Sequence, residues 1–290
     1  MALAGGIYGG WLALTLWHDA VPVWLLVPLG AWLVCWHSQL QHEFLHGHPT
    51  RSVSINRALG FAPLALWLPY DRYRETHLRH HRDERLTDPL DDPESRYWID
   101  EDWQRLGVIG RGIVRAQSTL LGRLVVGPFW AIGYFFVTEA RALLDGDRRL
   151  ARVWAQHLLA VAAVLVWLVL ACGMSLWFYL AAFVLPGTSL MLIRSFCEHR
   201  AHRDVGRRTA IVEDFGPLAV LFLYNNLHAA HHENPRLPWY ALPAWYRRNR
   251  ERLIAENGGL YYRGYTEVFR KFLVEPHDQP LHPLGRVPRY

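Results

Sequence analysis

Two long stretches of this chain carry almost no charge, and they limit the folds that are open to it. Between Met1 and His42 the only formally charged side chain is Asp19, and the stretch 153–193 has none. A helix of the second stretch's length would extend roughly 60 Å, about twice the thickness of a bilayer core. We therefore predict an all-α membrane protein.

Turn residues divide each apolar stretch into a helical hairpin. Asp19 and Pro22 mark the first turn, and the second turn falls near 172–175. We predict four transmembrane helices, over about 3–17, 23–46, 153–173 and 175–193. The remaining segments, 47–152 and 194–290, are expected to form a helical cap, and the whole chain 1–290 is expected to be a single domain.

The cap segments contain further local signals. We expect a helix over 71–82 and a loop over the acidic, proline-bearing residues 83–102. For 124–138 we expect an interfacial helix, with a membrane span as the alternative. The apolar run 59–68 is too short to span a bilayer and is expected to be re-entrant or interfacial.

The distribution of arginine predicts the orientation of the spans. The net charge of +5 comes from 31 basic and 26 acidic residues, and Lys271 is the only lysine. The two short hairpin turns contain no Lys or Arg, whereas the opposite segments contain nearly all of them. By the positive-inside rule, the cap and both termini should be cytoplasmic. Because this rule accounts for the arginines, we expect no nucleic-acid partner.

Three histidine clusters are the strongest chemical signal. They read His42-Glu-Phe-Leu-His46, His77-Leu-Arg-His80-His81 and His228-Ala-Ala-His231-His232. Residues three and four apart share a helix face, whereas neighbours diverge by about 100°. One cluster can therefore supply ligands to two metal ions. Eight imidazoles are too many for one tetrahedral zinc, so the pattern indicates a two-metal site within the cap.

The remaining histidines have no such spacing. We interpret most of them as ordinary surface or core residues: His18, His37, His48, His157, His277 and His282.

Several kinds of metal protein can be compared with this pattern. His42-Glu-Phe-Leu-His46 has the i, i+4 spacing of the zinc-protease motif, but a protease site has no use for six further histidines. Soluble di-iron proteins of the ferritin type use Glu and Glu-x-x-His ligands, and we find no such carboxylate pairs. An all-histidine two-metal site at a membrane surface indicates iron and O₂ chemistry.

With these clusters, the chain resembles the membrane-bound fatty acid desaturase superfamily, whose members include hydroxylases, ketolases and small-molecule oxygenases. The resemblance covers about 37–245. Besides the clusters, it rests on Asp88-Pro-Leu-Asp-Asp-Pro-Glu-Ser95, Arg194-Ser-Phe-Cys-Glu-His-Arg200 and Tyr224-Asn-Asn-Leu-His-Ala-Ala-His-His-Glu-Asn-Pro235 with the following Leu237-Pro-Trp-Tyr-Ala-Leu-Pro243. The last segments are most similar to compact bacterial members, including the rhizopine-oxygenase type.

The resemblance implies a fold of four transmembrane helices under a cytoplasmic cap, in the inner membrane of a bacterium. It also implies two non-haem iron ions held by nine histidines, with O₂ as co-substrate. The implied ligands are His42, His46, His77, His80, His81, His228, His231, His232 and a ninth between the fourth span and the third cluster. His199 is the expected ninth ligand, and His202 is the alternative.

Three further residues have expected roles near these ligands. Asn225 could hold an iron-bound water, or it could be a helix N-cap. Glu198 and Asp83 could orient imidazole N–H groups, or they could be solvated acids.

The expected function is O₂-dependent desaturation of a fatty acyl or other lipid chain. No redox segment is evident, so a separate donor, such as ferredoxin with its reductase, should supply electrons. The alternative is a di-iron oxygenase or hydroxylase acting on a smaller non-lipid molecule. A non-catalytic metal-binding or transport protein is a third hypothesis, but outside the first histidine cluster only His37 and His157 are histidines or charged residues inside the predicted spans.

Clustered arginines follow the third histidine cluster. Arg247, Arg248, Arg250 and Arg252 are expected to bind anionic lipid headgroups or to dock an acidic electron donor.

Overall fold

The computed structural model describes residues 1–285, apart from the side chain of Asp83. The chain is mostly helical and forms two compact units. The first contains Met1–Arg74 and Pro128–Met191, and the second contains Glu75–Gly127 and the chain from Leu192 onward. The segments 47–74 and 128–152 of the predicted cap belong to the same compact unit as the apolar hairpins.

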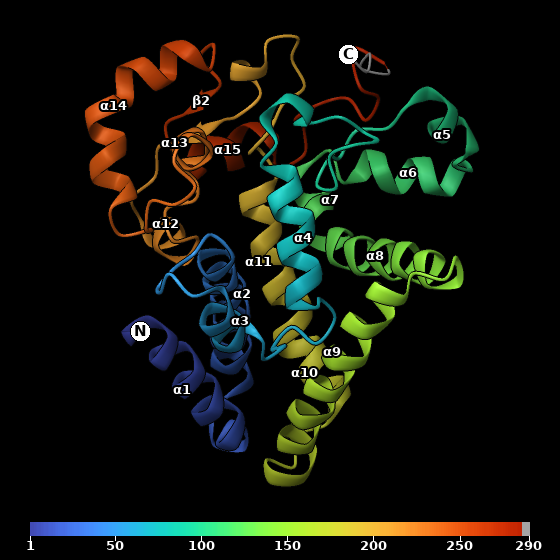
Figure 1. Ribbon diagram of the computed structural model, residues 1–290, viewed down its shortest axis with the longest axis vertical. Helices are drawn as coiled ribbons and strands as arrows, with labels where there is room; N and C mark the ends of the chain where they lie inside the picture. Colours follow the sequence, from blue (N-terminus) through green and yellow to red (C-terminus); the bar gives the residue numbers. More distant parts are fainter. Residues whose placement is uncertain (286–290) are drawn as a thin grey trace. The chain divides into compact units, whose positions relative to one another are not determined.

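The first unit is built from helices, some of which contain short 3₁₀ or π turns. Helices α1 and α2 form its N-terminal hairpin, joined by the 3₁₀ turn η1, and they lie side by side (Figure 1). The elements are α1 (Ala2–Leu16), η1 (His18–Ala20), α2 (Val23–Leu45), α3 (Val53–Gly60), α8 (Gly127–Leu144), α9 (Arg148–Val166), η3 (Trp167–Ala171), α10 (Leu176–Tyr179), η4 (Leu180–Val184) and α11 (Leu185–Ser195), whose last turn lies in the second unit.

Three helices among residues 1–285 are long and apolar enough to cross a membrane. They are Val23–Leu45, Arg148–Ala171 and Leu176–Ser195. The segment Ala2–Leu16 is apolar but shorter, so the fourth span remains a prediction. The third helix begins five residues earlier than predicted, at Arg148 instead of 153, because the Asp147 side chain accepts from the backbone N–H groups of Arg149 and Leu150.

The two hairpins of the first unit pack closely through small residues and a buried tyrosine. A Cβ atom at Gly30 of α2 would lie 2.6 Å from the Phe183 ring of η4, so only glycine allows this approach. The Tyr179 hydroxyl donates to the Leu64 carbonyl at 2.6 Å and accepts from the Trp11 indole at 2.9 Å. The segment 61–69, which follows α3 and is not helical, is held against the hairpins by these contacts.

The second unit consists of short helices around a small parallel sheet. Its elements are α4 (Tyr70–His80), which starts in the first unit, η2 (Asp83–Arg85), α5 (Asp100–Arg105), α6 (Val108–Ala116), α7 (Leu120–Val125), η5 (Val205–Arg207), β1 (Ile211–Val212), α12 (Pro217–Leu221), α13 (His228–Glu233), α14 (Leu242–Glu256), β2 (Tyr261–Tyr262) and α15 (Tyr265–Phe272). The helix predicted over 71–82 is confirmed as α4, and the predicted loop 83–102 holds except for η2 and the start of α5. The helix predicted over 124–138 begins at Gly127 and continues to Leu144.

The sheet positions the short helix that carries the third histidine cluster. Strand β1 pairs with β2, and α13 contacts both β1 and α14 (Figure 1). The Asn226 side chain donates to the Val212 and Asp214 carbonyls at 2.7 and 3.0 Å, and the Val212 N–H donates back to the Asn226 carbonyl. The turn before α13 is therefore attached to the end of β1.

Candidate metal centre

Two histidines of the first unit stand one turn apart at the end of α2. The rings of His42 and His46 are buried, and their centroids are 4.7 Å apart. His46 is the residue at which α2 ends, and its N–H donates to the His42 carbonyl. The i, i+4 spacing therefore presents two imidazoles on one face, with nitrogen atoms within 4.8 Å of each other.

Four histidines from three segments converge in the second unit. His80 ends α4, His199 follows α11, and His228 and His232 lie on α13. Each of the four rings has one nitrogen atom that could bind a metal, and these four nitrogens all lie within 4.8 Å of one another. The Nε2 atom of His199 is 3.1 Å from Nε2 of His80 and 2.9 Å from Nε2 of His228. We call these residues the four-histidine group.

Three further histidines converge in the same unit. Nε2 of His81 lies 3.0 Å from Nε2 of His77 and 3.1 Å from Nε2 of His231. We call them the three-histidine group. The adjacent pairs separate, since His80 and His232 face the four-histidine group while His81 and His231 face this one. The rotation of about 100° per helical residue produces this separation.

Carboxylates hold one imidazole of each group by its outward nitrogen. Nδ1 of His80 lies 2.9 Å from Oδ1 of Asp92, and Nδ1 of His77 lies 2.8 Å from Oε1 of Glu94. An ionised carboxylate only accepts hydrogen bonds, so in both rings Nδ1 carries the hydrogen. In the neutral ring, Nε2 then has a lone pair that faces the other histidines.

Two more rings of the four-histidine group are oriented in the same way. Nδ1 of His199 donates to the Arg208 carbonyl at 3.3 Å. Nδ1 of His228 lies 3.2 Å from Oδ1 of Asn225 and 3.4 Å from a carboxylate oxygen of Glu198. Both rings therefore also direct an Nε2 lone pair into the group.

This arrangement fits a metal ion. The Nε2 lone pairs of His199 and His228 face one another at 2.9 Å, and they repel unless a cation lies between them. Two nitrogens bound to one ion at about 2.1 Å are about 3.0 Å apart at a right angle and about 3.4 Å apart at the tetrahedral angle. The observed spacing is close to that of two ligands of one metal ion.

Burial and charge set the protonation of these rings. Burial lowers the pKa of His199 and His228 well below its ordinary value, and the neighbouring histidines lower it further. Burial also lowers the pKa of His80, but the Glu94 and Asp92 carboxylates outweigh burial and raise it to about 9. His199 and His228 are thus neutral at physiological pH, as metal ligands must be.

Sequence reasoning missed Asp92 and Glu94. Both belong to the acidic segment after the second cluster, which we predicted only as a loop. The signal that could have found them is a pair of carboxylates that follow two candidate ligands, His80 and His77, by 12 and 17 residues. The same segment also anchors His199, because the Arg96 guanidinium donates to the His199 carbonyl at 2.9 Å.

The two candidates for the ninth ligand lie in different surroundings. His199 lies within the four-histidine group. His202 is largely exposed, and its Nδ1 accepts from the Asp204 N–H at 3.0 Å. His202 belongs to neither group among the described residues.

Three further residues, Asn225, Glu198 and Asp83, were expected to lie near the metal ligands. Asn225 is not a helix N-cap, because Leu227 occupies that position in α13, and the Asn225 side chain contacts His228 instead. Glu198 is buried between Arg194, at 3.2 Å, and His228. The side chain of Asp83 lies outside the described residues.

Histidines outside the clusters have ordinary structural contacts. His37 pairs with the Tyr8 hydroxyl at 3.1 Å, and His157 with the Leu66 carbonyl at 2.8 Å. His277 is buried and accepts from the Arg96 guanidinium at 2.7 Å. Burial and nearby cations lower its pKa to about 2.

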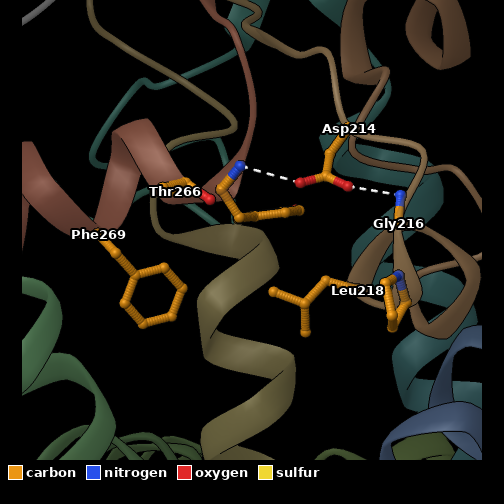
Figure 2. Close-up of a pocket in the computed structure, with 7 residues that line it drawn as sticks. Asp214, Gly216, Leu218, Thr266 and Phe269 are labelled. Carbon is orange, nitrogen blue, oxygen red and sulfur yellow. Dashed lines mark hydrogen bonds between the residues drawn. The ribbon is translucent and has the colours of Figure 1, made fainter.

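A cavity of about 430 Å³ lies elsewhere in the second unit. Figure 2 shows Asp214 at its edge, with Leu218 and Phe269 on the lining. The Asp214 carboxylate accepts from the Gly216 N–H at 2.7 Å and from the Tyr265 N–H at 3.1 Å, which ties the starts of α12 and α15 together. None of the lining residues of this cavity is a histidine, so it is separate from the metal groups.

Two of the four clustered arginines on α14 are already paired. Arg250 donates to Glu213 at 2.5 and 2.8 Å, and Arg252 pairs with Glu233 and Glu256. Arg247 and Arg248 are exposed. Any partner that this helix binds through charge would therefore depend chiefly on these two.

The chain was compared with curated proteins and with protein-family models. A search of curated proteins found no match. The family model described as fatty acid desaturase matches residues 15–266, which is most of the chain and includes all three histidine clusters. With its histidine clusters and apolar helices, the chain belongs to the fatty acid desaturase family, and it is an oxidoreductase of the membrane.

Proposed function

We propose that this protein is a membrane-bound non-haem di-iron oxidoreductase that desaturates a fatty acyl or other lipid chain. It uses O₂ and electrons from a separate donor. The observation that supports the proposal best is the convergence of Nε2 lone pairs in the four-histidine group, in a chain of the desaturase family. The facing lone pairs of His199 and His228 favour a cation, and iron is the metal that the family implies.

We assign the ligands in two sets. His80, His199, His228 and His232 would hold one iron. His77, His81 and His231 would hold the other, with His42 and His46 completing it. The inclusion of His42 and His46 rests on the family's histidine boxes and on the geometry of the pair within its own unit.

The two irons, when bound, would supply the activation of O₂ that removal of hydrogen from an unactivated C–H bond requires. In the overall reaction, a –CH₂–CH₂– unit, O₂, two electrons and two protons give –CH=CH– and two waters. The chain's own contribution is to bind and orient. Asp92 and Glu94 accept hydrogen bonds from the His80 and His77 rings and so orient them. Burial of the histidines limits the access of water.

The proposed setting is the inner membrane of a bacterium, with the metal centre on the cytoplasmic face. This follows from the arginine-free turns near Asp19 and Gly173 and from the bacterial resemblance. Ala2–Leu16 would then be a fourth, short span. Labelling of a cysteine introduced at position 19 only from the periplasmic side would support this topology, and labelling from the cytoplasm would reject it.

We also propose that an acidic donor, such as ferredoxin, delivers the electrons near Arg247 and Arg248. Exposed charges are screened over about 10 Å at 0.1 M salt, so added salt should slow electron delivery to the parent protein. Arg247→Gln with Arg248→Gln should remove most of that salt dependence, whereas the paired Arg252→Gln should leave it. Equal salt dependence in all three proteins would exclude this surface.

The central experiment supplies purified protein in nanodiscs with ferredoxin, its reductase and NAD(P)H. We expect about two irons per chain, and O₂ consumption only when a long-chain acyl compound is present, with an alkene as product. His228→Ala should lose both iron and activity. Incorporation of labelled oxygen into a small amine or polyol, with acyl chains inert, would reject desaturation and favour the oxygenase alternative.

A further inference from the structure

The loop after the second histidine cluster is built around buried carboxylates. Oδ2 of Asp92 accepts from the Thr87 N–H at 2.8 Å, and its Oδ1 accepts from the Glu94 N–H at 2.9 Å. The Ser95 hydroxyl donates to the Thr87 carbonyl at 2.8 Å and closes the loop. Thr87 has a φ of 69°, a strained conformation for a β-branched residue, which the surrounding bonds maintain.

This one loop reaches both metal groups. Asp92 bonds Nδ1 of His80, which belongs to the four-histidine group. Two residues later, Glu94 bonds Nδ1 of His77, which belongs to the three-histidine group. The other oxygen of Glu94 lies 3.9 Å from Nε2 of His80, beyond hydrogen-bond range, so Glu94 acts on His80 through its charge and does not hold the ring.

We propose that the loop 87–95 positions the two metals separately: Asp92 governs the metal of the four-histidine group through His80, and Glu94 governs the other through His77. A carboxylate on the outer nitrogen fixes the ring's tautomer and orientation and makes the inner nitrogen a better ligand. Both residues are positioning residues and need not touch the metal. The inference rests on the proposed function only for the identity of the metal as iron.

The metal affinity of the four-histidine group should depend more strongly on its loop carboxylate than that of the three-histidine group. The Asp92 side chain is 2 % exposed, whereas that of Glu94 is 31 % exposed. Water weakens a charge-assisted hydrogen bond, so His80 gains more from its carboxylate than His77 does. Loss of such a partner commonly lowers metal affinity about 10- to 100-fold. We expect Asp92→Asn near the upper end of this range and Glu94→Gln near the lower end.

The test is a Co(II) titration of the metal-free full-length protein in nanodiscs, followed by the visible spectrum of the bound metal. Two reference variants identify the binding steps. His228→Ala should remove the step that belongs to the four-histidine group, and His231→Ala should remove the other. Asp92→Asn should then weaken the first step about 100-fold, and Glu94→Gln should weaken chiefly the second, about 10-fold.

Two loop variants serve as matched controls. Asp88→Asn changes a buried carboxylate of the same loop that accepts from the Leu90 and Asp91 N–H groups. Asp91→Asn changes one that pairs with Arg85. Both should leave the two steps within about threefold of the parent. Loss of both steps together in Asp92→Asn or in Glu94→Gln, or an equal loss in Asp88→Asn, would show that the loop is merely structural and overturn the proposal.

The outcome is separable from that of the proposed function. If the parent protein binds Co(II) in two steps that respond as described but purifies without iron and without O₂ chemistry, the positioning inference stands and the di-iron function fails. If the parent contains two irons but neither Asp92→Asn nor Glu94→Gln changes a step, the positioning inference fails alone.

Discussion

Replacing His199 tests the ninth-ligand assignment most sharply. Nε2 of His199 lies between those of His80 and His228, at 3.1 and 2.9 Å, so it is the central donor of the four-histidine group. Removing a direct ligand should weaken binding at least as much as removing an outer partner, about 100-fold. A metal present at about 100 times the parent's Kd stabilises the fold by about 2.7 kcal/mol. In His199→Ala, the same concentration would stabilise it by only about 0.4 kcal/mol.

The metal-free proteins provide the internal reference. His199→Ala loses buried ring contacts and the contact with His80, but it also removes the repulsive lone-pair contact with His228, so these effects oppose each other. We expect the metal-free variant to be within about 1 kcal/mol of the metal-free parent, below the usual cost of a buried truncation. The loss should therefore appear almost entirely in the metal-dependent part of stability.

The assay is thermal unfolding in nanodiscs with and without Co(II), together with metal content. His202→Ala is the matched control, because His202 is largely exposed and contacts the backbone of Asp204. It should keep the metal-dependent stabilisation. If His202→Ala loses that stabilisation and His199→Ala keeps it, the ninth ligand is His202 and the lone-pair argument is refuted.

Two further predictions concern the stability of each unit. Gly30→Ala should lower thermal stability by about 1–3 kcal/mol because its Cβ would lie 2.6 Å from the Phe183 ring, whereas Gly9→Ala, which has open space around it, should not. Arg250 holds the pKa of Glu213 down to about 2, so the stability from this pair should be present above pH 4.5 and lost as pH falls toward 2. Unfolding of the metal-free protein across this window should show less pH dependence in Glu213→Gln, and an unchanged profile would contradict the role of the pair.

Much of the helical structure could be read from local patterns. The apolar stretches and the i, i+3, i+4 histidine spacing depend only on neighbouring residues, and α2 and α4 follow the predictions closely. The start of α9 was missed because its cap, Asp147, lies outside the apolar run that defined the prediction. The grouping of 47–74 and 128–152 with the apolar hairpins could not be read from the sequence, because contacts such as that between Tyr179 and Leu64 join residues far apart in the chain.

The sequence by itself determined which residues can bind metal and that adjacent histidines must face different ways, because helix geometry fixes those directions locally. Only the tertiary structure decided which rings share a group, that His199 joins one and His202 does not, and that Asp92 and Glu94 hold the imidazoles. These relations join segments that lie far apart along the chain or across an irregular loop. They depend on backbone hydrogen bonds and burial that no local pattern encodes.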